Sequence, residues 1–223
     1  MVRAFLIGAS PSVDLQQLKR GFRLAKFVSG RDLLIAVDGG LETCLRLGLR
    51  ADWWVGDADS WVFSRSELLE SAQAVVDLPR NKDRSDFYFA VQSALWRKVT
   101  HLYAFGVTGG RADHHLAVLQ DLAHFSGKGF LHVSAHGTDG DYFFLSERIS
   151  QWKQLMKAGR LISLFALSES VTGVTVRGVR FPLGLRTKAT LKGSSGLSNE
   201  AKAGTCLVSL KKGRLLVLLP ATE

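Results

Sequence analysis

Four short segments of the chain combine aspartates with glycines, lysines or arginines, the residue types that bind metal ions and phosphates. They are 38–40 (DGG), 56–60 (GDADS), 82–86 (KDRSD) and 109–114 (GGRADH). Each segment follows a run of residues that predicts a β-strand. Carboxylates at several strand ends, with a glycine turn and an arginine beside them, indicate a site for a divalent cation and a polyphosphate.

The segment 56–60 places Asp57 and Asp59 two residues apart, just beyond a predicted strand. If the chain stays extended there, both carboxylates point to the same side. Mg²⁺ usually takes one or two protein carboxylates together with substrate phosphates, so both are candidate metal ligands. The alternative is a polar turn in which Asp59 or Ser60 caps the following helix.

The segment 82–86 carries charges of both signs immediately before a predicted helix. Asp86 falls in the first helical turn, where a carboxylate also favours the helix dipole. Asp83 lies in the loop and has no such structural role. Lys82 could neutralise phosphate charge while Asp83 and Asp86 help to hold a metal ion, although a solvated charged loop is the alternative.

The segment 109–114 predicts a strand-to-helix turn of the kind that binds anions. The glycines, Gly110 among them, let backbone N–H groups approach a phosphate, and Arg111 could hold its oxygens with two hydrogen bonds. Asp113 could face the ligand or serve as the N-cap of the helix. His114 and His115 could be metal ligands, but without nearby cysteines we favour packing or supporting roles.

The elements that position these segments alternate between strand and helix over residues 1–140. Strands are predicted at 2–7, 33–37, 53–55, 74–78, 102–107 and 130–135, and helices at 14–27, 39–47, 64–71, 85–96 and 114–125. This alternation predicts an α/β fold with a mostly parallel sheet covered by helices on both faces. Ligands of such sheets bind beyond the carboxyl ends of the strands, where the aspartates fall.

After Gly140 the pattern changes to short strands separated by glycines. Strands are predicted at 142–145, 161–164, 174–176, 187–191, 205–210 and 215–219, and one helix at 151–158. This pattern is typical of a small all-β sandwich. We therefore expect two domains, 1–140 and 141–223.

The composition is that of a globular protein, with 46% hydrophobic and 22% charged residues among 223. No apolar run approaches the roughly 20 residues needed to cross a bilayer, and 2–7 lacks the layout of a secretory signal. Cys44 and Cys206 are far apart and without metal-ligand spacing, which favours structural thiols in the cytoplasm. We therefore expect no membrane partner.

The formal charge of +9 is unevenly distributed. Residues 1–140 hold 16 Lys and Arg against 15 Asp and Glu, whereas residues 141–223 hold 13 against 5. The basic residues of the second half are mostly single and spaced along predicted strands. We interpret them as a solvated face and expect no nucleic-acid partner.

The order and spacing of the four polar segments resemble the catalytic domain of the thiamine pyrophosphokinase family. The segment 194–200 (SSGLSNE) is similar to the thiamine-binding β-domain of that family, and 178–183 (GVRFPL) is similar to the strand before it. The resemblance thus covers nearly the whole chain and both predicted domains.

The resemblance implies a thiamine diphosphokinase, which transfers the diphosphate group of ATP to the thiamine hydroxyl with Mg²⁺ and releases AMP. By similarity, the catalytic and metal-binding residues would be Asp57, Asp59, Asp83 and Asp86, with Arg111 also catalytic. The nucleotide would lie among Asp38, Gly39, Lys82, Gly110, Arg111, Asp113 and His114. Thiamine would meet Ser195, Leu197, Ser198 and Asn199. Family members are dimers whose partner subunit completes the thiamine site, so the resemblance also implies a homodimer.

Some positions depart from the family pattern on the side of the acceptor substrate. Ala58 stands where an aromatic residue is usual, Val118 where asparagine is usual, and no Phe, Trp or Tyr follows Phe181. Two alternatives therefore stay open: a related diphosphokinase for another hydroxymethyl heterocycle such as a pterin, and a non-catalytic nucleotide- or RNA-binding protein. The acidic segments favour an enzyme, because without a metal ion they would repel phosphate.

Overall fold

The computed structural model describes residues 2–11, 13–57, 65–184 and 189–221. The chain forms two compact units, the first made of Met1–Leu119 with Ala135–Thr138 and the second of Gln120–Ser134 with Asp139–Glu223. This division passes through helix α5 (Ala112–Ser126) and strand β6 (His132–Gly137). The domain boundary predicted at residue 140 stays a prediction.

The first unit contains a parallel sheet with the strand order β5-β1-β2-β3-β4. The strands are β1 (Arg3–Ile7), β2 (Leu33–Val37), β3 (Ala51–Gly56), β4 (Ala72–Asp77) and β5 (His101–Phe105). The helices between them are α1 (Leu15–Leu24), α2 (Gly40–Arg46), α3 (Arg65–Ser71) and α4 (Asp86–Trp96). No helix in the described part of the chain is both long and apolar enough to cross a membrane.

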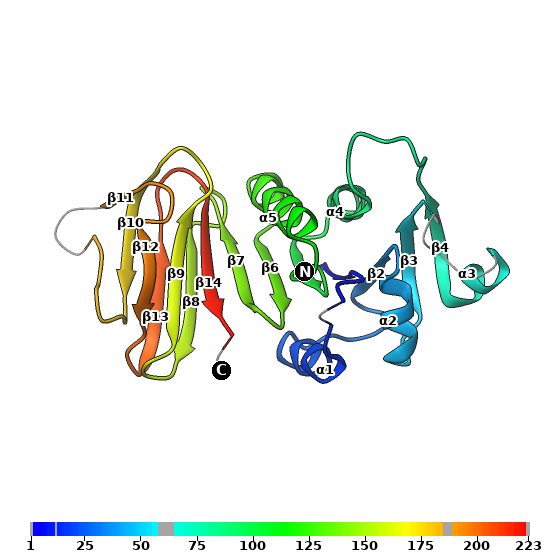
Figure 1. The fold of residues 1–223 in the computed structure, drawn as a ribbon, viewed down its shortest axis with the longest axis horizontal. Coiled ribbons are helices and arrows are strands. Elements are labelled where there is room, and N and C mark those ends of the chain that lie inside the picture. Colours follow the sequence, from blue (N-terminus) through cyan, green and yellow to red (C-terminus); the bar gives the residue numbers. More distant parts are fainter. Residues whose placement is uncertain (1, 12, 58–64, 185–188, 222–223) are drawn as a thin grey trace. The chain divides into compact units, whose positions relative to one another are not determined.

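Helices cover both faces of this sheet (Figure 1). Leu18 and Phe22 of α1 and Leu41 and Cys44 of α2 pack with Phe5 in one buried cluster. Helix α4 contacts β2 and β3 from the other face. Because both faces are covered, β2 consists of apolar residues throughout, as expected of a central parallel strand.

A buried ion pair ties the start of β1 to the loop that follows α1. Arg3 Nε donates to Asp32 Oδ1 at 2.9 Å, and its Nη1 and Nη2 donate to the carbonyls of Ala25 and Lys26, each at 2.6 Å. The Val28 N–H donates to Asp32 Oδ2 at 2.7 Å. Asp32 is 3% exposed, so its charge depends on these partners.

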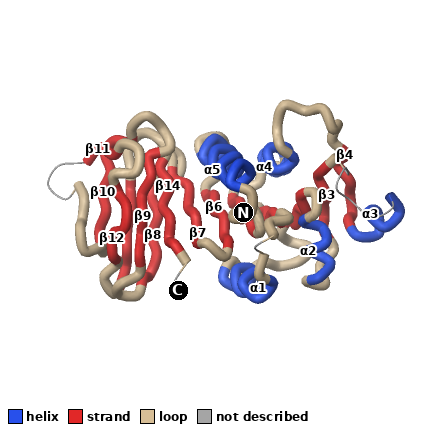
Figure 2. The backbone as a smooth tube through the Cα atoms, viewed as in Figure 1, coloured by secondary structure: helices blue, strands red, loops and turns tan. Residues whose placement is uncertain are grey.

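The second unit contains two antiparallel sheets, drawn as red strands in Figure 2. One has the order β12-β9-β14-β7 and the other β11-β10-β13-β8. The strands are β7 (Gly140–Leu145), β8 (Gln151–Met156), β9 (Leu161–Ala166), β10 (Val171–Arg177), β11 (Ala189–Leu191), β12 (Gly196–Glu200), β13 (Gly204–Ser209) and β14 (Leu215–Pro220). Residues of both sheets share one buried cluster, which includes Trp152, Leu164 and Val217, so the unit is a β-sandwich.

The helix predicted at 151–158 is wrong, because β8 occupies this segment. Its lysines, glutamines, leucine and methionine all have good helix propensity. Instead, the segment pairs with β13 in a register that sets Trp152 opposite Val208 and Met156 opposite Gly204. Trp152 and Met156 then point into the sandwich core, and this packing outweighs the local preference.

Candidate active site

Asp38 lies at the carboxyl end of β2, beside the end of β3. Its N–H donates to the carbonyl of Val55 at 2.9 Å, and its own carbonyl accepts from Trp54 Nε1 at 3.0 Å. Asp38 has φ of 49°, a left-handed conformation that few residues other than glycine adopt. Such backbone strain persists where the surroundings fix it and is frequent at functional sites.

The glycines after Asp38 allow α2 to begin against β1. A Cβ atom on Gly40 would lie 1.9 Å from the carbonyl oxygen of Ile7, and one on Gly39 would lie 3.0 Å from Ala9 Cβ. Gly40 therefore has to be glycine for this approach. The turn places Asp38 close to the loop that follows β1.

A cluster of three charged side chains forms at the carboxyl end of β3. Lys82 Nζ pairs with Asp57 Oδ2, and it lies 3.2 Å from Asp86 Oδ1. The side chains of Lys82, Asp57 and Asp86 are 9%, 10% and 20% exposed. Segments 56–60 and 82–86 therefore meet at these three residues.

Local structure explains how Asp86 reaches this cluster. Ser85 is the N-cap of α4, and its hydroxyl accepts from the Tyr88 N–H at 3.1 Å. Asp86 is then the first helical residue, four positions after Lys82. Asp83 lies exposed in the loop between them.

The pKa values in this cluster reflect burial and charge pairing. Burial alone would lower the pKa of the Lys82 ammonium, but its pairing with the carboxylates of Asp57 and Asp86 outweighs burial and raises it. Burial is the main cause that raises the pKa of Asp86, against the opposing effect of Lys82. A buried carboxyl with a raised pKa and a charged neighbour marks a candidate functional site.

Two carboxylates of this cluster could serve as ligands of a divalent cation. Two carboxylates converge on one position of positive charge, and carboxylate oxygens are the ligands that Mg²⁺ prefers. Asp86 Oδ1 is buried. Although it lies only 3.2 Å from Lys82 Nζ, it forms no hydrogen bond of good geometry. Among the described residues no group of three or more His, Cys, Asp or Glu side chains could hold a metal ion. Asp59 lies outside the described residues.

The loops after β1 and β5 meet where the strand order reverses. The Gly8 N–H donates to the carbonyl of Phe105 at 2.9 Å, the Ser10 N–H to that of Gly106 at 2.8 Å, and the Ser10 hydroxyl to that of Thr108 at 2.7 Å. A Cβ on Gly8 would lie 2.6 Å from the Gly106 carbonyl oxygen. Open α/β sheets bind ligands at this kind of switch point.

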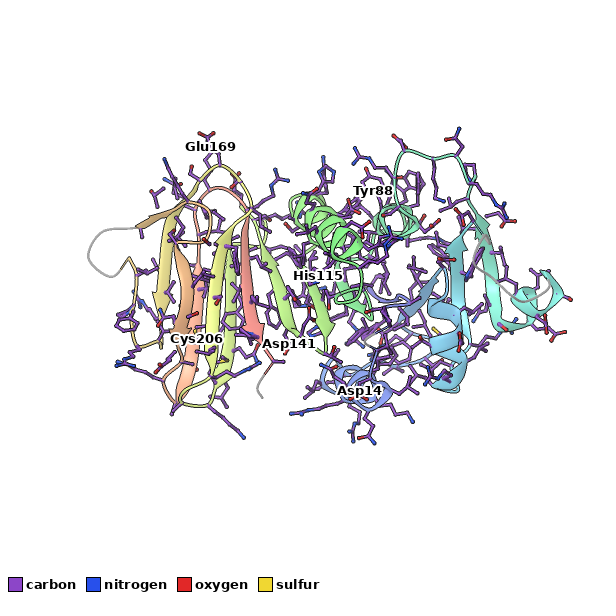
Figure 3. All side chains as sticks on the ribbon, in the orientation of Figure 1. Asp14, Tyr88, His115, Asp141, Glu169 and Cys206 are labelled. Atoms are coloured by element: carbon purple, nitrogen blue, oxygen red, sulfur yellow. The ribbon has the colours of Figure 1, made fainter. Side chains whose placement is uncertain are left out.

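The segment 109–114 continues from this switch point into α5. The Gly109 N–H donates to His115 Nδ1 at 3.1 Å, which identifies His115 (labelled in Figure 3) as a residue that orders the glycine turn. Gly110 has φ of 68°. Helix α5 begins at Ala112, so Asp113 lies inside its first turn and the N-cap alternative is wrong.

Arg111 and Asp113 form an exposed ion pair with two hydrogen bonds. Arg111 Nε donates to Asp113 Oδ1 at 3.1 Å and Nη2 to Oδ2 at 2.7 Å, and the two side chains are 73% and 63% exposed. The Arg111 guanidinium is the main cause that lowers the pKa of Asp113 to about 2. His114 is also exposed. The structure therefore brings Arg111 and Asp113 together, with His114 next to them in the first turn of α5.

In the second unit, the segment 195–199 forms an irregular edge strand. Strand β12 pairs with β9, but the register shifts between Gly196 and Asn199. Ser198 has φ of 53°, and its N–H donates to the Ser163 hydroxyl at 3.0 Å. Ser195 closes the preceding turn, and Leu197 is 51% exposed. A bulge of this kind re-aims side chains and is common near binding sites.

The side chain of Asn199 holds the backbone of Phe181. Asn199 Oδ1 accepts from the Phe181 N–H at 3.0 Å, and Nδ2 donates to the Phe181 carbonyl at 2.7 Å. Arg180 lies over the Phe181 ring at 5.3 Å and pairs with Glu200 at 3.3 Å. Phe181 is thereby fixed at the surface, where the residue is 60% exposed.

Sequence reasoning missed Asp77 and Phe181 as candidates. Asp77 is the last residue of β4 and pairs in register with Gly56 of β3. Gly56 directly precedes Asp57. It was missed because it lies within residues 74–78, which predict a strand. The signal that could have identified it is a carboxylate at the end of an apolar strand. Phe181 gave no such signal, because its anchoring depends on Asn199.

A parallel sheet with paired carboxylates, a buried lysine and glycine turns beyond its strands is typical of α/β enzymes that transfer phosphoryl groups. Residues 24–131 match the family model described as the thiamin pyrophosphokinase catalytic domain. Those residues are thus similar to a catalytic domain of the thiamine pyrophosphokinase family, in agreement with the predicted family and enzyme class.

Individual relatives agree with this assignment. The chain is similar to thiamine pyrophosphokinase from Bacillus subtilis (strain 168), with 28% identity over 202 residues, which cover 90% of this chain and 92% of the relative. A crystal structure from Bacillus subtilis matches with a TM-score of 0.79 and 22% identity, covering 100% of both chains. A structure from Candida albicans matches with a TM-score of 0.72 and 14% identity, covering 99% and 89%. The structural likenesses confirm the predicted fold.

Proposed function

We propose that the protein transfers the diphosphate group of ATP to the hydroxyl of thiamine, with Mg²⁺, and forms thiamine diphosphate and AMP. The observation that carries this proposal is the convergence of Asp57 and Asp86 on Lys82 at the carboxyl end of β3. The cluster lies within the residues that match the family's catalytic domain. The nucleotide phosphates would bind beside it.

The proposed reaction depends on positioning and charge neutralisation rather than on a covalent nucleophile. Attack of the acceptor hydroxyl would be on the β-phosphorus. Asp57 and Asp86 would hold Mg²⁺, with Asp59 and Asp83 contributing directly or through water. When bound, the ion would neutralise charge on the phosphate oxygens of ATP.

The remaining groups of the first unit would bind the nucleotide. Gly110 and the backbone around it would approach a phosphate, while Asp38, Gly39 and His114 would lie around the nucleotide. The Arg111 guanidinium would leave its ion pair with Asp113 and bind a phosphate oxygen instead. The exposure of both side chains supports this exchange, because exposed ion pairs contribute little stability.

The acceptor would bind at Ser195, Leu197, Ser198 and Asn199. The exposed residues and the register shift of β12 support a binding role for this segment. We further propose a homodimer, in which the partner subunit completes the acceptor site. The two free, buried cysteines of the described chain support a cytoplasmic location.

The acceptor is tested by measuring AMP release from ATP and Mg²⁺ with a panel that includes thiamine and a hydroxymethylpterin. We expect thiamine to give the highest kcat/KM. The pterin is the second candidate, because no aromatic residue follows Phe181 to stack on thiamine. AMP release with the pterin but not with thiamine would reverse the acceptor assignment while leaving the reaction type intact.

Replacement of Asn199 by alanine is expected to raise KM for thiamine by about tenfold, because two hydrogen bonds that fix Phe181 are lost from the edge of the acceptor segment. KM for ATP should change by less than about twofold. Steady-state kinetics with each substrate varied in turn provide the measurement. Ser209→Ala, which removes one hydrogen bond to Thr175 in the other sheet, is the control. Equal effects on both substrates would contradict an acceptor-side role.

A further inference from the structure

The position of Lys82 between two carboxylates has a consequence for metal binding. Lys82 Nζ is within ion-pair distance of both Asp57 and Asp86. Lys82 lies in the loop before α4, whereas Asp57 directly follows β3 and Asp86 begins α4. Its side chain is 9% exposed, so its charge lies mostly away from solvent. The ammonium thus stands where two candidate metal ligands converge.

We propose that Lys82 is an internal counter-ion that competes with the divalent cation for Asp57 and Asp86 and turns to a phosphate oxygen when the cation binds. This inference rests on the proposed function and adds a role for the lysine in metal affinity. Lys82 would hold the two carboxylates together in the metal-free protein. It would therefore act as a positioning residue for the metal site.

Elementary electrostatics supports this competition. Two carboxylates and one ammonium carry a net charge of −1, whereas a divalent cation added to all three groups would leave two cations side by side. Repulsion between like charges at this separation is strong where solvent screening is weak. The lysine side chain is flexible, whereas Asp57 directly follows β3 and Asp86 is the first residue of α4. Displacement of Lys82 is therefore the simplest response.

Arg84 does not share this position. Arg84, two residues later in the same loop, is exposed, and its guanidinium lies over the ring of Tyr88 at 5.2 Å. Lys82, by contrast, pairs with both Asp57 and Asp86. Arg84 therefore offers a matched control: a cation in the same loop without contact to the carboxylate pair.

The test is direct Mn²⁺ binding, measured by electron paramagnetic resonance, on the wild type, Lys82→Met and Arg84→Met. We expect Lys82→Met to bind Mn²⁺ at least about tenfold more tightly than the wild type, and Arg84→Met to differ by less than about threefold. Without metal, Lys82→Met should melt at a lower temperature than the wild type, because its carboxylates repel each other. Saturating Mn²⁺ should close this difference.

Equal or weaker Mn²⁺ binding by Lys82→Met would overturn the role of Lys82, and so would an equal gain in Arg84→Met. Lys82→Gln serves as the second variant if the methionine variant does not fold. Measurements on the wild type distinguish a wrong role for Lys82 from a wrong proposed function. A wild type that binds no Mn²⁺ and releases no AMP from ATP would overturn the proposed function itself.

Discussion

Asparagine in place of Asp57 is expected to lower kcat for AMP formation by about 10³-fold, equivalent to roughly 4 kcal/mol of transition-state stabilisation. The substitution keeps the size of the side chain but removes the charge that faces Lys82. In the proposed site the same charge holds the metal ion against the phosphates. The loss should therefore appear mainly in kcat, with the fold retained.

Steady-state AMP release at saturating ATP, thiamine and Mg²⁺ measures this effect, and circular dichroism verifies the fold. Asp52→Asn is the matched control, because Asp52 lies near the other end of β3 and binds the Leu34 N–H at 2.7 Å. The control removes the same charge near the opposite end of β3, away from the cluster. Turnover near the wild-type rate in Asp57→Asn would contradict the metal-binding role of Asp57.

Alanine in place of Asp32 is expected to lower the free energy of unfolding by about 3–5 kcal/mol, the usual effect of removing one partner from a buried ion pair. Arg3 would then remain largely buried, with a side chain that is 11% exposed and no counter-charge. The Val28 N–H would also lose its acceptor. Urea unfolding at neutral pH measures the loss.

The same ion pair predicts how this loss depends on pH. Burial alone would raise the pKa of Asp32, but hydrogen bonds from Arg3, Val28 and Arg31 outweigh burial and hold it below the ordinary value of 3.8. A carboxyl with a lowered pKa stabilises the fold above that ordinary value, and its contribution disappears as pH falls through the folded-state pKa. The difference between wild type and Asp32→Ala should therefore shrink below about pH 4.

Glu169→Gln is the control for both measurements, because Glu169 lies on an exposed loop of the second unit (Figure 3). We expect its free energy of unfolding to stay within about 0.5 kcal/mol of the wild type. If the difference in free energy of unfolding between wild type and Asp32→Ala stays constant down to pH 2, the ionised Asp32 carboxylate is not the source of that difference.

Much of the fold follows from local patterns in the sequence. Buried parallel strands such as β2 are continuous apolar runs, and Ser85 before an amphipathic segment predicts the N-cap that the structure shows. The segment 151–158 was mispredicted, because its pairing with β13 depends on residues some fifty positions away along the chain. Propensity alone carries no information about such a partner.

Part of the candidate site could likewise be predicted from the sequence, and part of it could not. Asp38 and Asp57 could be placed together because parallel strands end at one edge of a sheet. The contact between Lys82 and Asp57 joins residues 25 positions apart, and the hydrogen bonds between Asn199 and Phe181 join residues 18 apart. These contacts depend on loop paths that residue spacing does not determine. The ion pair between Arg111 and Asp113 depends on side-chain rotamers, which the sequence does not determine either.

The proposed transfer of a diphosphate group from ATP to thiamine is tested most directly by identifying the products of one reaction. The purified protein is incubated with ATP, Mg²⁺ and thiamine, and the products are assigned by phosphorus NMR and mass spectrometry. We predict AMP and thiamine diphosphate in equal amounts, formed only when all three are present. ADP with thiamine monophosphate, or consumption of ATP that does not depend on thiamine, would contradict this proposal.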